Sequence, residues 1–514
     1  MSCSAPLSLL LSSPHLLLPV APQLTVSPSR SCDPRSSDVV SWTSSIGRLA
    51  RRGHLAAAAA EFSSMLSSSS SPNHVTFITL LSACADFSSS PFSFQLGLSL
   101  HSLALKLSLF SSPRSLLLIT TALIDFYFNI GLTVVARQLF DRMPLRNIYT
   151  YNAMIAGHMK NAQINEALDI FHGNPSRDLV SWTAIIDGCV KNGFPEEALE
   201  HFRKMQVERI DPDYVTAIAV AAACSDLGAL GHGMWLHYLA LKRGLLGNVR
   251  VGNALIDMYS KCGRVDFAQQ VFDEMPKRTL VSWNSMIMGL AVNGRSAEAL
   301  LLFSAMQGSE FKPDSVSFTA AITSCSHAGL VDDGLYLSQL MQRKYGVRAR
   351  AEHYGCLVDL LARAGLIEKA VSLVERMPMK PNEVMLGSLM AACRAHGDVG
   401  LAERLMALLI QVEPDTDSNY VLMSNIYAAM GRWEGVVKVR SLMKELGVKK
   451  KPGFSAVEIG CIVHQFVAGD HAHAETEEIY DLLDLLHFDL EFFGYEPTIA
   501  AGAIDEVFSG GYID

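Results

Sequence analysis

The chain has 514 residues, and 49% of them are hydrophobic, which is enough for a long continuous helical core. Its net charge of −9 argues against binding driven by phosphate attraction alone, yet residues 467–514 hold twelve acids and no lysine or arginine, which leaves residues 1–466 at +3. No apolar run reaches the roughly 18 residues of a membrane span, and the ten cysteines lack metal-ligand spacing, so we expect neither a membrane helix nor a metal site.

Residues 1–37 have the composition of a removable targeting segment. They contain ten serines, many leucines and prolines, and only Arg30, Arg35 and Asp33 as charged residues. This composition is typical of a transit peptide, and the lack of early arginines favours the chloroplast over the mitochondrion. A secretory signal is the rival interpretation, because LSLLLSSPHLLLPV is strongly apolar, but no basic residue precedes it.

From residue 39 onward the sequence alternates between short helical patterns and turns, most clearly over residues 280–314. Apolar residues from Trp283 to Leu290 recur at helical spacing, and Gly294 follows as a turn. A second apolar helix comes next and ends before Pro313, which cannot continue it. One such helix pair is too small to bury its own apolar face, so the pattern predicts stacked neighbours.

These neighbours are visible as internal repeats. Trp42 and Trp182 stand in the same local pattern as Trp283, and Met-Pro pairs mark the end of another repeating unit. Trp182 and Trp283 are 101 residues apart, which fits two units of 35 residues and one of 31. A tetratricopeptide array with a fixed period of 34 residues cannot produce this spacing.

The motifs SWNSMI, NALIDMYSKCG, SCSHAGLVDDG, EHYGCLVDLLARAG and SNYVLMSNIYAAMGRW follow one another in this chain. In these motifs the chain resembles plant pentatricopeptide repeat (PPR) proteins that alternate P, L and S repeats, over about residues 39–474. The stretch KPGFSAVEIGCIVHQFVAGDHAHAET is similar to the E and E-plus extensions of organelle RNA-editing factors. The resemblance implies an all-α fold, a right-handed superhelical solenoid of stacked helix-turn-helix repeats with a small C-terminal extension.

The predicted organisation divides the chain into five parts: a transit peptide (1–37), a repeat array (38–382), an E region of two degenerate helix pairs (383–449), an E-plus-like segment (450–474) and an acidic amphipathic tail (475–514). Within the E-plus-like segment, short alternation in SAVEIGCIVHQFV predicts a small β-hairpin. In the tail we expect a helix over about 475–493 and a frayed end. Ten repeats are predicted, at 39–73, 74–116, 117–147, 148–178, 179–213, 214–248, 249–279, 280–314, 315–350 and 351–382.

Two local features of the array need an interpretation. A serine- and proline-rich insertion near residues 88–93 swells the second repeat, and we interpret it as a loop between its two helices. Cys84, Cys224 and Cys325 occupy the same position in three L repeats, which predicts small buried hydrophobic residues.

The resemblance implies that the fifth and the last residue of a repeat together choose one RNA base. The pairs are Thr43 with Asn73 and Thr121 with Asn147 for adenine, Asn152 with Asp178 and Asn284 with Asp314 for uracil, Thr183 with Asp213 for guanine, and Asn253 with Thr279 for a pyrimidine. Repeats with Ile78, Ile218, Thr319 or Gly355 at the fifth position should distinguish poorly between RNA bases. Asn and Asp at helix starts are also common caps, but their recurrence in register over six repeats favours base reading.

No catalytic residue and no cofactor are predicted. His473-Ala474-Glu475 matches the H-x-E of zinc nucleotide deaminases, but those enzymes also need a downstream P-C-x-x-C, and no cysteine follows Cys461. Residues 228–233 are glycine-rich but have no preceding strand, so we interpret them as a turn between helices and not as a phosphate loop. Residues 449–451 are interpreted as a solvated basic turn.

The resemblance therefore implies a site-recognition factor for C-to-U editing of chloroplast transcripts. It would bind single-stranded organelle RNA just 5′ of the target cytidine, with chain and RNA parallel. A DYW-type cytidine deaminase would act in trans, with multiple-organellar-editing-factor proteins as further partners. A role in transcript stabilisation, processing or splicing without editing is the main alternative. A protein–protein scaffold is a second alternative, which predicts no regular pairing of Thr or Asn with Asn or Asp.

Overall fold

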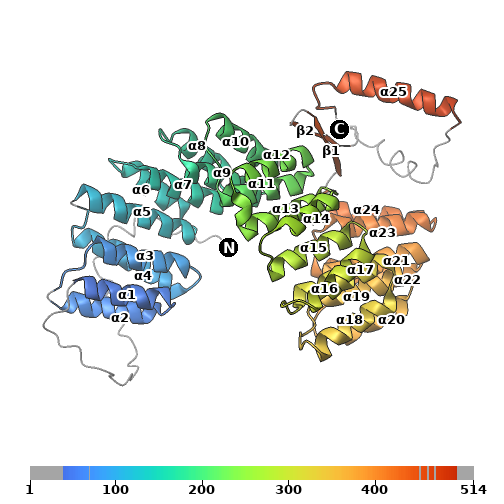
Figure 1. Ribbon diagram of the computed structural model, residues 1–514, viewed down its shortest axis with the longest axis horizontal. Helices are drawn as coiled ribbons and strands as arrows, with labels where there is room; N and C mark the ends of the chain where they lie inside the picture. Colours follow the sequence, from blue (N-terminus) through green and yellow to red (C-terminus); the bar gives the residue numbers. More distant parts are fainter. Residues whose placement is uncertain are drawn as a thin grey trace. The chain divides into compact units, whose positions relative to one another are not determined.

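The structure is a computed structural model that describes residues 39–68, 70–110, 112–450, 453–459, 462–467 and 471–494 (Figure 1). The predicted transit peptide and the final twenty residues lie outside the described residues. The chain divides into two compact units, Met1–Leu145 and Arg146–Asp514, and each is considered by itself.

The described part of the first unit consists of helix pairs. Its helices are α1 (Val39–Arg51), α2 (Leu55–Ser67), α3 (His74–Asp86), α4 (Pro91–Lys106), α5 (Pro113–Asn129) and α6 (Thr133–Arg142).

The second unit continues the same alternation of helices and ends in a hairpin and a helix. Its elements are α7 (Ile148–Lys160), α8 (Ile164–His172), α9 (Leu179–Lys191), α10 (Pro195–Val207), α11 (Tyr214–Leu227), α12 (Leu230–Lys242), η2 (Leu245–Gly247), α13 (Val249–Lys261), α14 (Val265–Glu274), α15 (Leu280–Val292), α16 (Ser296–Gln307), α17 (Ser315–Ala328), α18 (Val331–Arg343), α19 (Ala351–Arg363), α20 (Ile367–Arg376), α21 (Glu383–His396), α22 (Val399–Val412), α23 (Asp417–Ala429), α24 (Trp433–Glu445), β1 (Phe454–Ile459), β2 (Ile462–Val467) and α25 (Thr476–Phe492).

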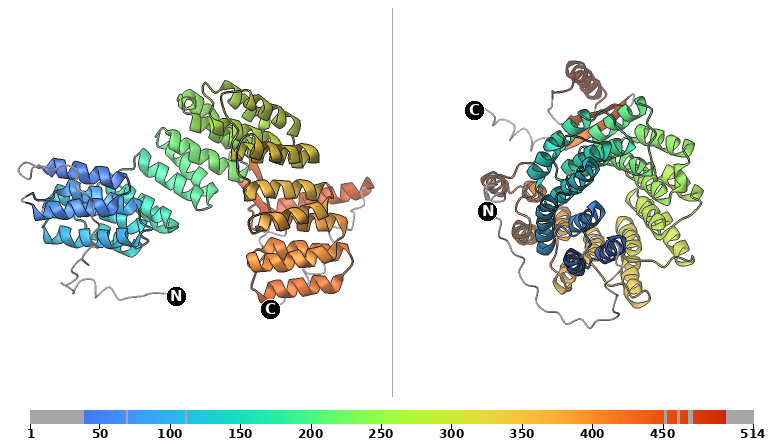
Figure 2. Two further views of the ribbon diagram at one scale, coloured as in Figure 1. Left: turned by 90° about the horizontal axis from the view of Figure 1, so that it is seen from below. Right: turned by 90° about the vertical axis from the view of Figure 1, so that its left-hand side faces the viewer.

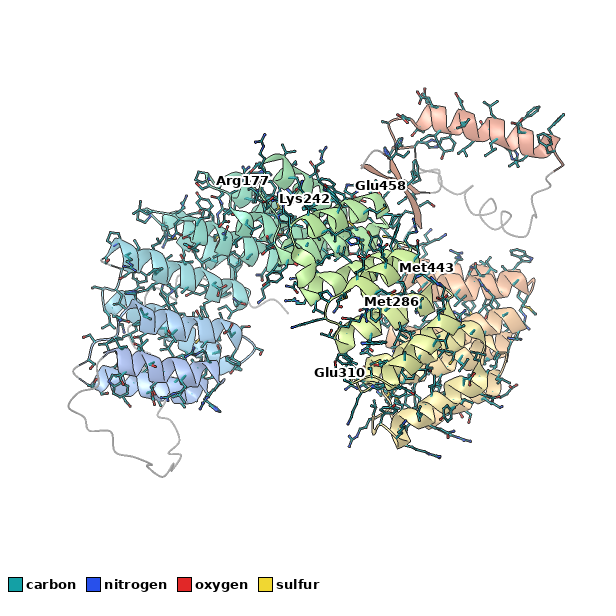
Figure 3. The ribbon with its side chains drawn as sticks, in the orientation of Figure 1. Arg177, Lys242, Met286, Glu310, Met443 and Glu458 are labelled. Atoms are coloured by element: carbon teal, nitrogen blue, oxygen red, sulfur yellow. The ribbon has the colours of Figure 1, made fainter. Side chains whose placement is uncertain are left out.

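Each helix pair packs in the same way within its unit. The first helix of a pair lies against its own second helix and against the first helix of the next pair, as α15 does with α16 and α17 (Figure 2). The buried side chains of Met286, Ile287 and Leu290 fill the space between these helices, and Figure 3 marks Met286 inside the stack. Burial of such apolar faces between neighbours is what stabilises a repeat protein, so the predicted all-α solenoid class is confirmed.

Local sequence explains where the first helices begin and end. The residue before a first helix is commonly Asn or Asp, and its side chain accepts a hydrogen bond from a backbone N–H in the first turn, as Asp213 does from Thr216 at 2.9 Å. Several helices end at a glycine with left-handed backbone, such as Gly228 after α11 with φ of 66°. These signals recur in many of the repeats, and the helix pattern recurs with them.

The second repeat differs from the prediction made for it. The residues near 88–93 were expected to form a loop, but α4 begins at Pro91, because proline at the first helical position suits the fixed geometry of a helix start. The Ser93 hydroxyl is buried and donates to the carbonyl oxygen of Cys84 at 2.6 Å. The extra length instead lies in the 16 residues of α4 and in the segment after it. Helix α5 likewise begins four residues before the predicted repeat boundary at 117.

The three cysteines predicted to be small buried residues are all buried, with free thiols. Burial raises the pKa of the Cys84 thiol to about 11 and that of Cys325 to about 11, so both stay protonated at neutral pH.

The predicted hairpin is present and contacts the repeat array. Strands β1 and β2 are antiparallel, with Phe454 opposite Val467. The carboxylate of Glu458 accepts hydrogen bonds from the backbone N–H groups of Gly231 (2.6 Å) and His232 (2.9 Å), and lies 2.5 Å from the His232 Nδ1 (Figure 3). Residues 228–233 are therefore the predicted turn plus the first residues of α12, and the start of this helix holds a carboxylate.

Helix α25 carries apolar side chains that stay in contact with solvent. Leu482, Leu486, Phe488 and Phe492 are all more than half exposed. In the part of the chain that the structure describes, no helix combines the length and the hydropathy needed to cross a bilayer.

Candidate nucleic-acid interface

Most of the residues predicted to read bases lie at equivalent places. The predicted fifth residue lies one turn into its first helix, except for Thr121, which lies two turns into α5 because that helix begins at Pro113. The last residue of each of these repeats is the N-cap of the next first helix. Because consecutive first helices are packed side by side, from α7 to α9 and onward to α19, these positions recur along one side of the stack. Within the second unit, the structure brings Asn152 and Asn284 into contact with the N-cap that follows each of them.

Two repeats hold an Asn beside an Asp in the same geometry. The Asn284 Nδ2 donates to the Asp314 Oδ1 at 3.0 Å, and the Asn152 Nδ2 donates to the Asp178 Oδ1 at 3.1 Å. Asn284 and Asn152 are buried, with exposed fractions of 6% and 9%. The two side chains of each pair are therefore in direct contact.

Hydrogen bonds keep these aspartates ionised. Burial tends to raise the pKa of Asp314, but the N–H and hydroxyl of Ser317 and the amide of Asn284 outweigh it and hold this pKa below its usual value. The pKa of Asp178 is lowered in the same way, against the effect of burial, by Ser181 and Asn152. Each side chain is therefore an anion at neutral pH.

Capping by an Asn or Asp side chain uses one of its two polar atoms and leaves the other available. The Asp213 Oδ1 accepts from the N–H and the hydroxyl of Thr216, both at 2.9 Å, and the Asn73 Oδ1 accepts from the N–H groups of Val75 and Thr76. The structure gives no partner within the described residues to the Asp213 Oδ2 or to the Asn73 Nδ2. An Asp cap thus offers an acceptor, whereas an Asn cap offers a donor.

The threonines at the fifth position are held by their own helices. The Thr43 Oγ1 donates to the Val39 carbonyl oxygen and the Thr183 Oγ1 donates to the Leu179 carbonyl oxygen, each at 2.8 Å. The Thr121 Oγ1 donates to the Leu117 carbonyl oxygen, also at 2.8 Å. Asn147 belongs to the second unit, where its Oδ1 caps α7 by accepting from the Thr150 N–H.

The pair of Asn253 and Thr279 is arranged differently. The Asn253 Oδ1 is buried and has no hydrogen-bond partner among the described residues. The Thr279 side chain is instead engaged with Ser282 in a capping box at the start of α15. This repeat therefore lacks the direct contact between its two reading positions that the Asn and Asp pairs have.

The residues at the remaining fifth positions offer fewer hydrogen-bonding groups to a ligand. Ile78 and Ile218 are partly buried and carry no hydrogen-bonding group, and Gly355 has no side chain. The Thr319 Oγ1 donates to the Ser315 carbonyl oxygen at 3.0 Å, as the other threonines do within their helices.

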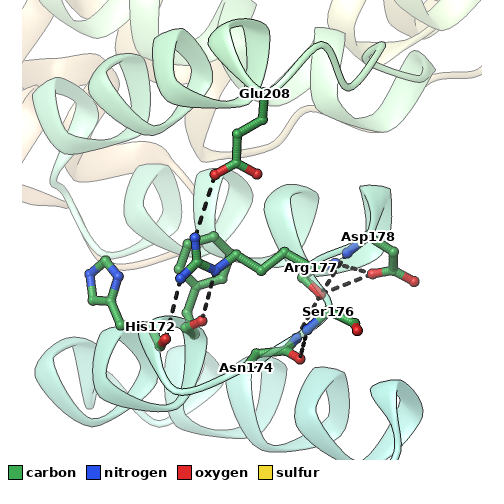
Figure 4. A network of polar contacts seen from close by, with 8 residues as sticks. His172, Asn174, Ser176, Arg177, Asp178 and Glu208 are labelled. Carbon is green, nitrogen blue, oxygen red and sulfur yellow. Dashed lines mark hydrogen bonds and ion pairs between the residues drawn. The ribbon is translucent and has the colours of Figure 1, made fainter.

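An arginine before the N-cap anchors the start of two first helices. The Arg177 guanidinium donates to the carbonyl oxygens of Phe171 and His172, lies 5.0 Å from the Phe171 ring centroid and pairs with Glu208 (Figure 4). Arg278 makes the same contacts with the end of α14, through the carbonyl oxygens of Phe272 and Asp273. These bonds satisfy open carbonyl groups at a helix end and hold the next N-cap in place.

The second residue of the first helix is apolar and exposed in seven repeats of the array at 38–382, and sequence reasoning did not name it. Val281 and Tyr149 are 57% and 72% exposed. The others are Val40, Val75, Val180, Val215 and Val316. Recurrence of an apolar residue at a solvent-facing position was the signal that could have found them, because such residues offer flat apolar contacts beside each polar pair.

The H-x-E motif near the C-terminus is engaged in local bonds. The His473 Nε2 lies 2.9 Å from the His464 Nδ1, and the Glu475 N–H donates to the His473 Nδ1 at 3.1 Å. Across the described ranges, the His, Cys, Asp and Glu side chains form no group of three or more that could hold a metal ion.

Fold and surface together define a class: an α-helical repeat protein in which several repeats carry a polar residue at the fifth position and a polar N-cap after it, with exposed apolar residues nearby. Comparison with known families gives the same class. A family model described as "PPR repeat" matches residues 149–173, 180–210, 253–280 and 352–381. A second model, "PPR repeat family", matches residues 278–327, and an "E motif" model matches residues 396–458.

The curated relatives are pentatricopeptide repeat proteins of Arabidopsis thaliana. A chloroplastic relative is 52% identical over 468 residues, which span 91% of this chain and 93% of the relative. A putative mitochondrial relative is 37% identical over 470 residues, which span 91% of this chain and 69% of the relative. The chain therefore belongs to the pentatricopeptide repeat family and carries an E motif.

Solved structures of this family are also similar. The crystal structure of PPR10 from maize is 18% identical, with a TM-score of 0.49, and the match covers 80% of this chain and 64% of that one. PPR10 in complex with an 18-nucleotide psaJ RNA element is 16% identical, with a TM-score of 0.43, and the match covers 81% and 76% of the two chains.

Proposed function

We propose that this protein binds single-stranded chloroplast RNA base by base and selects cytidines for C-to-U editing, with the deaminase supplied by a partner in trans. The observation that carries the proposal is the free atom of each N-cap. Its chemical character changes from donor to acceptor between repeats, while the surrounding geometry stays the same.

The free atom suits one class of base at each repeat. An Asp cap presents an acceptor, which matches the N1–H of guanine or the N3–H of uracil, whereas an Asn cap presents a donor, which matches the unprotonated N1 of adenine or N3 of cytosine. At the fifth position, the shorter Thr leaves room for a purine and the longer Asn favours a pyrimidine. Together these preferences support adenine for Thr43 with Asn73, guanine for Thr183 with Asp213 and uracil for Asn284 with Asp314.

The exposed apolar second residues support single-stranded RNA as the ligand. A base that is unstacked from its neighbours needs apolar contacts on its faces, and Val281 and Tyr149 offer such contacts at the edge of their polar pairs. A mildly basic repeat array adds only weak attraction for phosphate, so affinity would accumulate from many bases.

The preferred sequence can be measured directly. In 5′ to 3′ order the repeats should favour A, any base, A, U, G, any base, a pyrimidine and U, followed by two weakly read positions. Selection from a random RNA pool with purified protein should enrich the central A-U-G. A pool without that enrichment would contradict the proposed register.

The editing role has its own test and its own alternative. Sequencing of organelle RNA from a plant that lacks the protein should reveal at least one cytidine that is no longer converted, next to a sequence that the repeats favour. If the transcript were instead shortened or lost while its editing stayed complete, the protein would be a stabilisation or processing factor. The E motif favours the first outcome.

Helix α25 supports recruitment of a partner protein. It carries exposed leucines and phenylalanines, including Leu482 and Phe488, on a segment with acids and no lysine or arginine. Like charge repels this segment from RNA phosphate, whereas an apolar helix face suits a groove on another protein. The partner proposed here is a DYW-type cytidine deaminase, together with multiple-organellar-editing-factor proteins, as implied by the family.

A further inference from the structure

In six repeats of the array, the third residue of the first helix is a buried serine or threonine. All six side chains have an exposed fraction of 0%. They are Thr76, Thr150, Ser181, Thr216, Ser282 and Ser317. A serine or threonine at this place can complete a capping box with the N-cap of its own helix, which is its ordinary role.

Four of these hydroxyls make a second contact, with the fifth residue of the preceding repeat. The Ser317 hydroxyl donates to the Asn284 Oδ1 and the Ser181 hydroxyl donates to the Asn152 Oδ1, each at 2.6 Å. The other two contacts join threonine hydroxyls across repeats. They are Thr43 to Thr76 at 2.8 Å and Thr183 to Thr216 at 2.7 Å.

The type of hydroxyl follows the type of fifth residue. Asn is paired with Ser, as in Asn284 with Ser317, and Thr is paired with Thr, as in Thr183 with Thr216. Both combinations contain the same number of side-chain heavy atoms, so they fill the same closely packed space between two first helices. A capping role alone would not require this matching.

The repeat that begins at Val249 shows that the contact is not automatic. The third residue of the following repeat, Ser282, is as buried as the others. The Ser282 Oγ accepts from the Thr279 N–H at 3.0 Å and lies 3.2 Å from the Thr279 Oγ1. The Asn253 Oδ1 then has no partner in the described part of the chain. The amide of Asn253 is therefore held less firmly than the amides of Asn152 and Asn284.

We propose that the third residue of the following repeat is a further specificity-determining residue, which sets the orientation of the fifth residue. The proposal rests on the proposed function as an RNA reader. The Ser317 hydroxyl occupies the Asn284 Oδ1 while the Asn284 Nδ2 donates to Asp314, so rotation of the amide would lose both bonds and place Oδ1 against a carboxylate. Asn284 thus presents its remaining N–H hydrogen in one fixed direction, whereas Asn253 can present either a donor or an acceptor.

Two consequences follow for base choice. Asn284 and Asn152 should discriminate sharply between uracil and cytosine, because donor and acceptor positions are both fixed. Asn253 should accept either pyrimidine. Ser317 and Ser181 act through another side chain and are therefore positioning residues.

The test measures full-length protein with four RNAs that differ only at the nucleotide opposite the repeat that begins at Leu280. From the usual penalty for one mismatched base, the wild-type protein should prefer uracil over cytosine by about tenfold. Ser317→Ala should reduce this preference to about threefold or less. Ser282→Ala is the matched control, because it removes an equally buried hydroxyl from a capping box that does not contact a fifth residue. It should leave the preference at the nucleotide opposite the repeat that begins at Leu280 unchanged.

A conservative exchange gives a readout that a purely structural role would not change. Asn284→Thr alone should shift the preference toward guanine, since it recreates the Thr and Asp combination of residues 183 and 213. Asn284→Thr combined with Ser317→Thr should sharpen the guanine preference further, by about threefold, because it restores the matched pair of threonines.

The outcomes separate this proposal from the function on which it rests. If Ser317→Ala weakens binding to all four RNAs equally and the double exchange is no sharper than the single one, the third residue is only a cap and the proposal is overturned. If the wild-type protein shows no preference among the four RNAs, base reading itself is overturned. Thermal unfolding of each variant shows whether a loss of binding comes from loss of folding.

Discussion

At the scale of single residues, the geometry of each N-cap decides which atom is available for a ligand. Capping takes the Oδ1 of Asp or Asn, so an exchange between these residues changes the remaining atom from acceptor to donor with little change in shape. Under the proposed function, this separation of a capping atom from a reading atom lets one position serve both roles. The cap interpretation and the reading interpretation are therefore compatible.

An exchange of both reading residues should convert one base preference into another. Asn284→Thr combined with Asp314→Asn recreates the combination of Thr43 with Asn73, so that repeat should shift from uracil toward adenine. Each mismatch should cost about 1–3 kcal/mol of binding free energy. Gel shifts with both RNAs and both proteins measure this, and equal affinities in all four combinations would mean that these residues are only caps.

A buried histidine should make stability depend on pH. Burial lowers the pKa of His201 to about 4, and its Nδ1 has no partner among the described residues. Between pH 6.5 and 4 the unfolded chain binds a proton at this residue and the folded chain does not, so the free energy of unfolding should fall by about 2 kcal/mol between pH 7 and pH 5.

Replacement of the histidine isolates its contribution. His201→Phe keeps a ring beside Phe171 and Trp182 and removes the titrating group. The part of the fall in the free energy of unfolding that comes from this residue should therefore disappear. His54→Gln, which changes an exposed histidine in the first unit, should keep this fall in the free energy of unfolding. Urea unfolding of the three proteins at both pH values measures the difference, and parallel behaviour of all three would contradict the assignment.

At the scale of helices, stacking depends on close approach between neighbouring first helices. Gly289 in α15 faces Ser260 in α13, and a Cβ added at Gly289 would lie 3.0 Å from the Ser260 Cβ and closer still to its hydroxyl. Gly387 in α21 lies in a helix as well, but a Cβ added there would meet no atom within 4 Å. The same residue type thus has two different roles in one fold.

One substitution at these two glycines should have opposite effects. Gly289→Ala forces atoms together in a packed interface and should destabilise the protein by about 1–3 kcal/mol. Gly387→Ala removes backbone freedom from a helix without a clash and should stabilise it by up to about 1 kcal/mol. Thermal unfolding measures both shifts, and shifts of the same sign would show that the packing difference has no energetic consequence.

The hairpin also depends on a contact between elements. Glu458 in β1 accepts from two N–H groups at the start of α12, where the helix dipole favours a negative charge. Glu458→Gln should weaken these bonds by about 1.4 kcal/mol, so the Gly231 and His232 amides should exchange hydrogen about tenfold faster. Glu434→Gln, at an exposed acid in the first turn of α24, is the control and should leave this exchange unchanged. Equal exchange in wild type and Glu458→Gln would show that the hairpin does not protect α12.

At the scale of the whole molecule, RNA binding and recruitment are expected to reside in different parts of the chain. The repeats carry the polar pairs, whereas residues 467–514 carry twelve acids without a lysine or arginine. Exposed apolar residues such as Leu486 and Phe492 in α25 add a face that suits a protein partner.

Truncation should therefore separate the two activities. A variant that ends near Lys451 should keep most RNA affinity in gel shifts but fail to restore editing in a plant that lacks the protein. Full-length protein alone should leave cytidine unconverted in vitro. Restoration of editing by the truncated variant, or deamination by the purified protein, would contradict recruitment in trans.

The sequence by itself determined the helix pairs and their periods near 31 and 35 residues, and it led to the proposed positions of the reading residues. It did so because the signals are local: a cap, an apolar stripe and a closing turn recur within each repeat. Where a local signal was misinterpreted, as at Pro91, it belonged to the one irregular repeat. The buried cysteines were predictable for the same reason, since their position recurs three times.

Only the tertiary structure decided which atoms meet across repeats. Ser317 and Asn284 are 33 residues apart, and Glu458 and His232 are 226 apart, so no local pattern relates them. Asn253 and Asn284 look equivalent in the sequence, yet the Asn284 Oδ1 has a hydrogen-bond partner, whereas the Asn253 Oδ1 has none among the residues that the structure describes. Local propensity sets where each helix lies, whereas hydrogen bonding between side chains depends on how the helices pack, and that packing is a property of the folded stack.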